Sequence, residues 1–355
     1  MRNKKVQIIV GLVLGLVLVW FLFRSADWKA VFAAIQDASW IWLVIALGLI
    51  APVFFTRAQR WSYIVRTAGP VSFRHIFSAT QIGFLAVFIL PARLGEIVRA
   101  IVLGRLARLP FSKCMAMVAL DRITDFMSLL AVILVTILTY SPSQDIKIPK
   151  ELFGWDNDFV FAAATVQRFE VRATVLVVVG LAVLVSLYLK PDLVLGISDR
   201  CLGLVSKKLA AWAHTFLQHF VDGLSVFRSA PDMLKSILFS FATWSFYMLS
   251  LWACLRAFNI ECPWYTPFLM ELLVAVLISM PLLPGYIGQY HLALVVSLRM
   301  VSPDIDFSKA LAFAIVVHLL NMFPVFVAGG FCLFWEKFGV VELGREAKHS
   351  VAETR

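Results

Sequence analysis

Charged residues beside the hydrophobic runs are the side chains of this sequence best suited to chemistry. Arg93, Glu96 and Arg99 follow Pro91 at intervals of three residues or fewer, so they share one broad face if the segment is helical. A charge at the centre of a membrane helix costs roughly 2.5–3.5 kcal/mol, so such charges require partners. Glu96 can pair with either arginine, which leaves guanidinium donors whose planar fork suits a phosphate. We therefore expect an anion-binding group here; the alternative is an ion-paired cluster at the membrane surface that only orients the protein.

A second charged group opens the next hydrophobic run and consists of Asp121, Arg122 and Asp125. Asp121 and Asp125 are four residues apart, so they repel one another on a helix face unless cations lie nearby. We expect Arg93 or Arg99 to supply the cation and to tie the two segments together. This contact is either a structural clamp or part of a functional site, and the sequence leaves both open.

A proline–glycine break interrupts a hydrophobic run in each half of the chain, at residues 91–96 and 284–289. Both read proline, three residues, glycine and a polar residue. Broken backbone survives in hydrocarbon only where it is buried in protein or lines a wet cavity. Breaks at corresponding places in two halves indicate the binding site of a transporter. The expected hinge residues are Pro91, Gly95, Pro284, Gly285 and Gly288.

Uncharged polar groups accompany the second break and the last hydrophobic run. They are Tyr286, Gln289, Tyr290 and His291 after the break, and His318 and Asn321 on one face of the last run. His291 is either a titratable group beside a turn or a histidine held by packing. For His318 and Asn321 we favour hydrogen bonds between helices over a place in a cavity. We expect the two breaks to meet near mid-membrane, with the polar residues of the second facing Arg93 and Glu96 across a polar cavity.

The composition defines the class of protein that must hold these residues. Apolar residues make up 61% of 355 and the mean hydropathy is +0.86, whereas soluble domains are roughly 45–50% apolar. The chain is therefore a polytopic membrane protein. Its net charge of +10 comes from Lys and Arg residues that flank hydrophobic runs, which indicates the positive-inside bias and not nucleic-acid binding. The five cysteines show no metal or redox spacing, so we interpret them as core residues.

Hydrophobic length and flanking charge predict the topology. We expect full spans at about 6–23, 39–56, 115–140, 171–189, 235–257 and 308–335. The acidic loop 141–170 and residues 301–307 then lie outside. Residues 191–232 form amphipathic helices at the cytoplasmic interface, with a packed cytosolic helical hairpin as the alternative. Basic residues keep both ends of 75–110 inside, so that segment dips in and returns, and 265–300 does the same from outside.

The expected fold is therefore an all-α, polytopic integral membrane protein with about six full spans and two oppositely inserted re-entrant helical hairpins, an inverted repeat. Residues 1–336 form a single transmembrane domain, and residues 337–355 form a short cytoplasmic tail. The competing topology has eight or more plain spans. It would place the basic residues between Arg93 and Lys113 outside, against the usual bias.

Three segments of the sequence, taken in order, resemble a known family. They are 89–99 (Ile-Leu-Pro-Ala-Arg-Leu-Gly-Glu-Ile-Val-Arg), 121–125 (Asp-Arg-Ile-Thr-Asp) and 284–288 (Pro-Gly-Tyr-Ile-Gly). The chain is similar over about residues 5–335 to the lysylphosphatidylglycerol synthase transmembrane-region family, also called flippase-like membrane proteins. In multidomain relatives a cytosolic aminoacyltransferase domain makes an aminoacylated lipid, and the membrane domain moves it across the bilayer. We recognise no transferase domain in these 355 residues, so the resemblance implies lipid movement without lipid synthesis.

We expect a lipid flippase that moves an anionic or phosphate-bearing (glyco)lipid across the inner membrane, with both termini cytoplasmic. No catalytic triad, nucleotide-binding loop or metal cluster is evident, so we expect no enzyme activity, no metal and no cofactor. The expected partners are the bilayer, the lipid substrate and a separate lipid-modifying enzyme, but no nucleic acid. Alternatives are a non-transporting scaffold that binds lipid and recruits such an enzyme through 191–232, and an intramembrane enzyme acting on lipid-linked sugar or phosphate. The residues expected to bind substrate are Arg93, Glu96, Arg99, Asp121, Arg122, Asp125, Tyr286, Gln289 and His291.

Overall fold

The computed structural model describes residues 2–24, 26–90, 94–140, 145–148, 159–203, 230–279 and 283–353, with a few residues between 206 and 218. Pro91, Ala92 and Arg93 lie outside the described residues, as do part of 141–170 and most of 204–229. What the sequence predicts for the hinge at Pro91 and for binding by Arg93 therefore stays a prediction.

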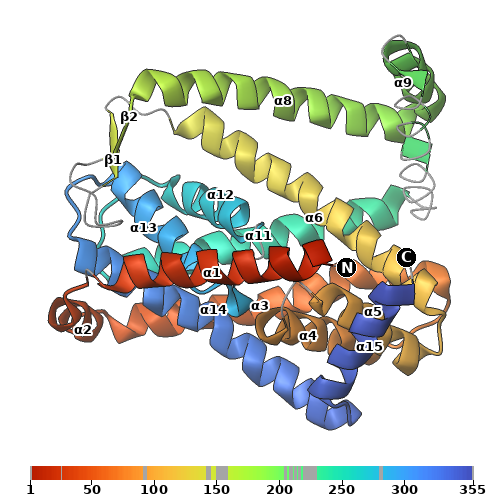
Figure 1. Ribbon diagram of the computed structural model, residues 1–355, viewed down its shortest axis with the longest axis horizontal. Coiled ribbons are helices and arrows are strands. Elements are labelled where there is room, and N and C mark those ends of the chain that lie inside the picture. Colours follow the sequence, from red (N-terminus) through yellow and green to blue (C-terminus); the bar gives the residue numbers. More distant parts are fainter. Residues whose placement is uncertain are drawn as a thin grey trace.

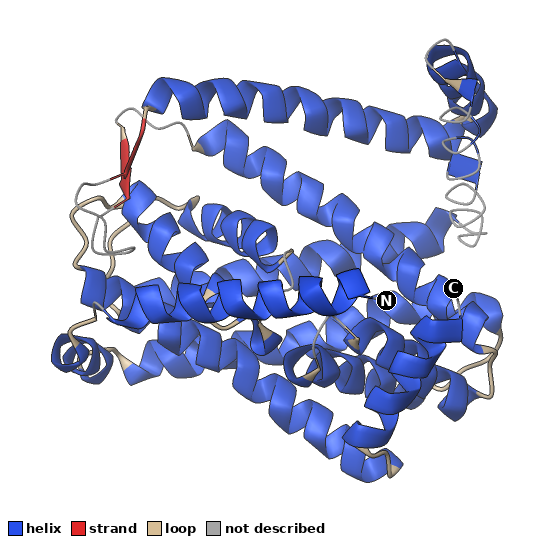
Figure 2. Cartoon of the chain, viewed as in Figure 1, coloured by secondary structure: helices blue, strands red, loops and turns tan. Residues whose placement is uncertain are grey.

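Six long helices make up most of the described chain (Figures 1 and 2). They are α1 (Arg2–Arg24), α3 (Trp40–Val65), α6 (Phe111–Thr139), α8 (Ala163–Leu189), α11 (Ala230–Ala257) and α14 (Phe307–Glu336). They contain 23 to 30 residues, which is roughly 35–45 Å of helix, longer than a hydrocarbon core of about 30 Å. Four described segments are both long and apolar enough to cross a membrane: Trp40–Ala68, Phe111–Thr139, Pro231–Ala257 and Phe307–Glu336. The predicted all-α polytopic fold is confirmed.

Four shorter helices form two pairs, each broken at a predicted place. The first pair is α4 (Phe73–Ile89) and α5 (Gly95–Ala107). The second is α12 (Thr266–Ile278) and α13 (Gln289–Val301), with the 3₁₀ turn η3 (Pro284–Tyr286) between them. Their lengths of 13 to 17 residues reach about 20–26 Å, too short to cross a core of about 30 Å. Each pair is therefore a re-entrant hairpin.

The long helices α3 and α11 run antiparallel and define the two ends of the bundle. The Ser39 N–H, just before α3, donates to the carbonyl of Ala257 at the end of α11, at 2.8 Å. Further along the pair, the hydroxyls of Thr56 and Thr243 are 2.7 Å apart. The C-terminal ends of α3 and α11 therefore lie at opposite ends of the bundle.

The two hairpins begin where α3 and α11 end, so they enter from opposite faces. The first returns to its own side, since Lys113 Nζ after α5 donates to the carbonyl of Ala68 after α3, at 3.3 Å. The second also returns, since Ser302 Oγ after α13 lies 3.5 Å from the carbonyl of Glu261 after α11. The predicted inverted arrangement of hairpins is confirmed.

Smaller elements lie at the two ends of the bundle (Figure 1). They are α2 (Trp28–Gln36), η1 (Arg66–Ala68), α9 (Pro191–Gly203), α15 (Val340–Glu353), and an antiparallel ribbon of β1 (Ile146–Ile148) and β2 (Phe159–Phe161). Both chain ends and α9 lie at the right of Figure 1, whereas α2 and the ribbon lie at the left. The C-terminal segment packs back on the bundle, because Leu343 and Ala347 of α15 are buried against the first hairpin.

Each hairpin packs in a hydrophobic core of its own. One core joins the first hairpin to α3, α6 and α15, and the other joins the second hairpin to α11 and α14. Fully buried members are Trp61, Ile82 and Leu103 in the first, and Leu255, Met270 and Phe313 in the second. Within the first hairpin a glycine allows close packing. A Cβ at Gly95 would lie 2.6 Å from the backbone nitrogen of Val87 and closer still to the carbonyl of Gly83.

Candidate functional site

Six charged side chains from α3, α5 and α6 form one connected ion network: Arg60, Glu96, Arg99, Asp121, Arg122 and Asp125. Three are cations and three are anions, so the network is neutral as a whole. Neutrality and mutual pairing are what buried charges require in a medium of low dielectric. The network holds the first hairpin against two spanning helices.

Arg60 is the centre of the network and the residue that the sequence patterns missed. It is 0% exposed. Its Nε lies 2.9 Å from Oδ1 of Asp121, its Nη1 lies 2.7 Å from Oδ1 of Asp125, and Nη1 also donates to Ser240 Oγ at 3.2 Å. The repulsion expected between the two aspartates is therefore relieved by a cation from α3. In the sequence, Arg60 reads as one of several basic residues after a span, so only packing shows its role.

Arg99 makes the contact that was predicted between the first hairpin and α6. Its Nη1 lies 2.6 Å from Oδ2 of Asp121, and the centre of its guanidinium is 3.6 Å from the ring centroid of Trp61. The residue is only 2% exposed. This geometry confirms the tie between the two segments. It also encloses the guanidinium, because a carboxylate and an indole face cover it.

Glu96 and Arg122 form the accessible edge of the network. Arg122 Nε lies 3.4 Å from Oε1 of Glu96, and Arg122 Nη1 lies 3.3 Å from Oδ2 of Asp125. The Arg122 and Glu96 side chains are 38% and 28% exposed, whereas Asp121 is fully buried. We expected Glu96 to pair with Arg93 or Arg99. Among the described residues, its ion-pair partner is Arg122 instead, because α6 packs beside the start of α5.

The second break is held by hydrogen bonds from its own polar residues. Gly285 and Gly288 have φ of 68° and 87°, a left-handed backbone that glycine adopts without strain. His318 Nε2 lies 2.9 Å from the carbonyl of Gly285, and the Gly288 N–H donates to His291 Nδ1 at 3.3 Å. Gln289 Nε2 donates to the carbonyl of Leu277 in α12 at 2.6 Å. These bonds satisfy backbone groups that hydrocarbon could not.

The last spanning helix is joined to the second hairpin, as favoured from the sequence. Besides the bond from His318, Asn321 Nδ2 donates to the hydroxyl of Tyr290 at 3.3 Å. The prediction of hydrogen bonds between helices is confirmed for both residues. His291 packs edge-on against Phe23 and His318, with ring centroids 5.4 Å and 4.8 Å away. The prediction that His291 faces the first hairpin is therefore wrong, because its ring turns toward α1 and α14.

The two hairpins meet inside the bundle, as predicted. The rings of Phe88, near the end of α4, and Tyr286, in η3, have centroids 6.0 Å apart. A Cβ placed on Gly285 would lie 3.5 Å from Cδ1 of Phe88. The broken backbones that enter from opposite faces are therefore in contact through their described residues.

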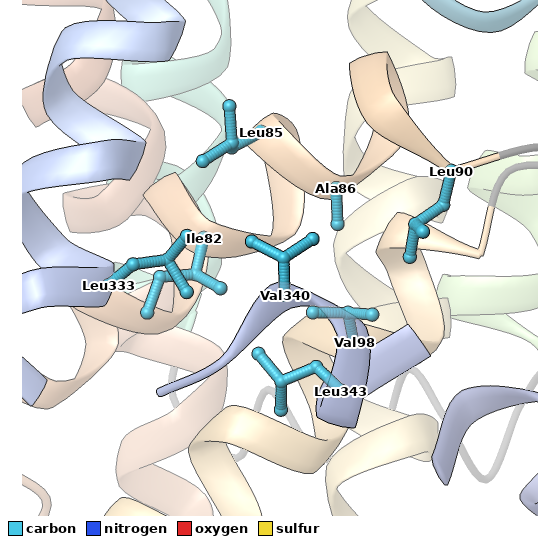
Figure 3. A pocket seen from close by; sticks show the side chains of 8 residues that line it. All are labelled: Ile82, Leu85, Ala86, Leu90, Val98, Leu333, Val340 and Leu343. Atoms are coloured by element: carbon cyan, nitrogen blue, oxygen red, sulfur yellow. The ribbon is translucent and has the colours of Figure 1, made fainter. Parts of the chain in front are cut away.

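An apolar pocket lies beside the end of the first hairpin (Figure 3). It is lined by Ile82, Leu85, Ala86, Leu90, Val98, Leu333, Val340 and Leu343. Leu90 directly follows α4, the other residues come from α4, α5, α14 and α15, and all have hydrocarbon side chains. The pocket differs in character from the polar cavity that was expected beside Arg93, a residue outside the described part of the chain.

Six long helices and two opposed hairpins that touch in the interior define a polytopic membrane protein with an inverted repeat. The chain belongs to the family described as lysylphosphatidylglycerol synthase TM region, whose sequence model matches residues 8–329. The resemblance seen in the sequence is thus confirmed. The chain is also 21% identical over 261 residues to the UPF0104 membrane protein MJ1078 of Methanocaldococcus jannaschii, covering 74% of this chain and 98% of that protein. No solved structure matches this chain.

Proposed function

We propose that this protein is a lipid translocase that moves a phosphate-bearing lipid between the leaflets of the inner membrane. The observation that carries the proposal is the contact between two broken hairpins inserted from opposite faces, at Phe88, Gly285 and Tyr286. Backbone breaks at membrane depth mark substrate pathways in transporters, because only protein or a wet cavity can satisfy them. Separation of the two hairpin ends would open a path between the leaflets, and their contact would close it.

The accessible edge of the ion network supports a site for the head group. Arg122 is the described arginine of the network with the most exposed side chain, at 38%, and it lies beside the start of α5. A guanidinium fork binds phosphate oxygens in a bidentate way. Arg93 is two residues before the start of α5 in the sequence and would add a second cation. In this proposal Arg60, Arg99 and Asp121 hold the geometry, while Arg122 meets the phosphate.

Charge supports an orientation with both termini in the cytoplasm. Arg2, Lys4 and Lys5 lie at the start of α1, before its apolar run, which fits the positive-inside bias. Arg105 at the end of α5 pairs with Glu342, at 2.9 Å, and with Glu346 of α15. The return of the first hairpin and the C-terminal helix are thus on one side. The proposed partners are the bilayer, its lipids and a separate lipid-modifying enzyme, and we propose no enzymatic step for this chain.

A non-transporting scaffold is the second candidate, and one observation favours it. Leu193 and Ile197 on α9 are 53% and 54% exposed, at a spacing of one helical turn. Such a face fits a membrane surface or a partner protein. A scaffold of this kind would bind lipid and recruit an enzyme without moving the lipid.

Reconstitution separates the two candidates. The purified protein is placed in liposomes that hold a tail-labelled fluorescent phospholipid, and a membrane-impermeant reductant bleaches the outer leaflet. If the protein is a translocase, it moves labelled lipid from the inner to the outer leaflet, so the reductant bleaches the inner-leaflet fluorescence faster than it does in protein-free liposomes. Arg122→Lys keeps the charge but loses the fork, so we expect the rate to fall about tenfold, the value of one charge-assisted hydrogen bond. The matched control is Arg74→Lys, at an arginine outside the ion network whose side chain is 57% exposed in its pair with Glu336. A wild-type rate equal to that of empty liposomes contradicts the translocase and leaves the scaffold.

A further inference from the structure

Two charged side chains at membrane depth lie outside the ion network, one in each half. Arg57 is on α3, three residues before Arg60, and Glu271 is on α12 of the second hairpin. Glu271 is 8% exposed, and it forms no hydrogen bond or ion pair among the described residues. The Nε of Arg57 is buried and has no hydrogen-bond partner there either. Ionisable side chains at membrane depth are expensive, and they mark substrate pathways.

Aromatic side chains surround Arg57 and Glu271 where the first and second hairpins approach one another. The guanidinium centre of Arg57 lies 4.4 Å from the ring centroid of Phe84, on the first hairpin, and 5.1 Å from that of Tyr247, on α11. Glu271 lies within electrostatic reach of Arg57 and Tyr247, and also of Tyr290 on the second hairpin. One guanidinium group and one carboxyl group therefore face a common region that both hairpins border.

The region lies near the middle of the membrane. Tyr247 is ten residues before the end of α11 at Ala257, which is about 15 Å along the helix and half of a core about 30 Å thick. Gln81, one turn before Phe84 on α4, is 1% exposed and its Oε1 has no hydrogen-bond partner among the described residues. The Nε–H donor of Arg57, the acceptor Oε1 of Gln81 and the carboxyl group of Glu271 thus all lack a hydrogen-bond partner among the described residues, and all lie where the two halves of the bundle meet.

We propose that Arg57 and Glu271 bind the head group of a zwitterionic phospholipid. At this second site, separate from the edge of the ion network at Arg122, Arg57 takes the phosphate and Glu271 takes the ammonium group. The charges decide this class: a ligand with one charge of each sign matches both side chains, whereas a purely anionic head group is repelled by Glu271. The ring faces of Phe84 and Tyr247 position the guanidinium. The inference rests on the proposed function, since it names the lipid class that the translocase carries.

The test is equilibrium binding to the purified full-length protein in detergent, measured by titration calorimetry. The probes are short-chain phosphatidylethanolamine, its N-acetylated derivative, which keeps the phosphate but loses the ammonium charge, and phosphatidylglycerol. We expect the wild type to bind phosphatidylethanolamine about tenfold more tightly than either other lipid, the value of one charge-assisted contact. Glu271→Gln abolishes that preference, Glu271→Asp retains part of it, and Arg57→Gln weakens binding of all three lipids. Glu261→Gln, at an exposed carboxylate in the connector after α11, is the matched control and changes nothing.

Equal wild-type affinity for phosphatidylethanolamine and its N-acetylated derivative overturns the proposal, as does absence of binding. A preference that survives in Glu271→Gln also overturns it. Glu271→Asp keeps the carboxylate, so it tests the site even if Glu271→Gln does not fold. The readout involves no translocation. A protein that binds with the predicted preference but does not move lipid contradicts the translocase and leaves this site in place.

Discussion

Replacing Arg60 tests whether the ion network clamps the first hairpin to the bundle. Arg60→Met removes the cation that lies 2.9 Å from Asp121 and 2.7 Å from Asp125, and it leaves two cations against three anions. Removing one partner of a buried ion pair costs about 3–5 kcal/mol, since the other charge stays uncompensated. We expect the free energy of unfolding to fall by that amount in an SDS titration followed by tryptophan fluorescence.

Charge balance makes this prediction specific. Asp125→Asn combined with Arg60→Met restores neutrality, so the double variant should recover about 0.5–3 kcal/mol relative to the sum of the single variants. The matched control is Lys235→Met, which removes a cation whose side chain is 54% exposed and whose partner Asp232 is 47% exposed, and it should cost at most about 1 kcal/mol. An Arg60→Met loss no larger than the control, or strictly additive effects in the double variant, would refute the clamp.

Two further predictions concern the hairpins. Gly95→Ala places a Cβ 2.6 Å from the Val87 nitrogen, so we expect the free energy of unfolding to fall by about 1–3 kcal/mol. The control Gly48→Ala has nothing within 4 Å of the added atom and should not lower stability. Equal midpoints of SDS unfolding for the two variants would contradict the close packing at Gly95. On a background without the native cysteines, single cysteines at the exposed positions Arg105 and Asp304 should react with a membrane-impermeant maleimide from opposite sides, and labelling of both from one side would reject the opposed hairpins.

Most of the fold follows from signals that are local in the sequence. Apolar length separates the long helices from the short ones, and basic flanks set which ends share a side. The proline–glycine breaks then fix where each hairpin turns. The site was predictable only in part. The contact of Arg99 with Asp121 followed from the need of an intramembrane charge for a partner.

The rest depends on packing that no spacing rule reveals. Arg57 and Arg60 follow an apolar run, where flanking charges are common, and only the packing of α3 against α6 and α11 shows that Arg60 is buried. His291 was assigned to the wrong neighbours because the rotation of α13 about its axis is set by tertiary contacts. Glu271 did leave a signal: it is the single acidic residue between Pro263 and Pro303, and an isolated carboxylate in such a run is a functional candidate.

The most direct test of the account is translocation through a protein whose hairpins are locked together. Phe88→Cys and Tyr286→Cys, whose native rings have centroids 6.0 Å apart, are joined by a short bis-methanethiosulfonate cross-linker on a background without the native cysteines. In liposomes, we predict that the uncross-linked protein moves phospholipid, that the cross-linked protein does not, and that reduction restores the rate. Lipid movement at the full rate by completely cross-linked protein would contradict passage between the hairpins.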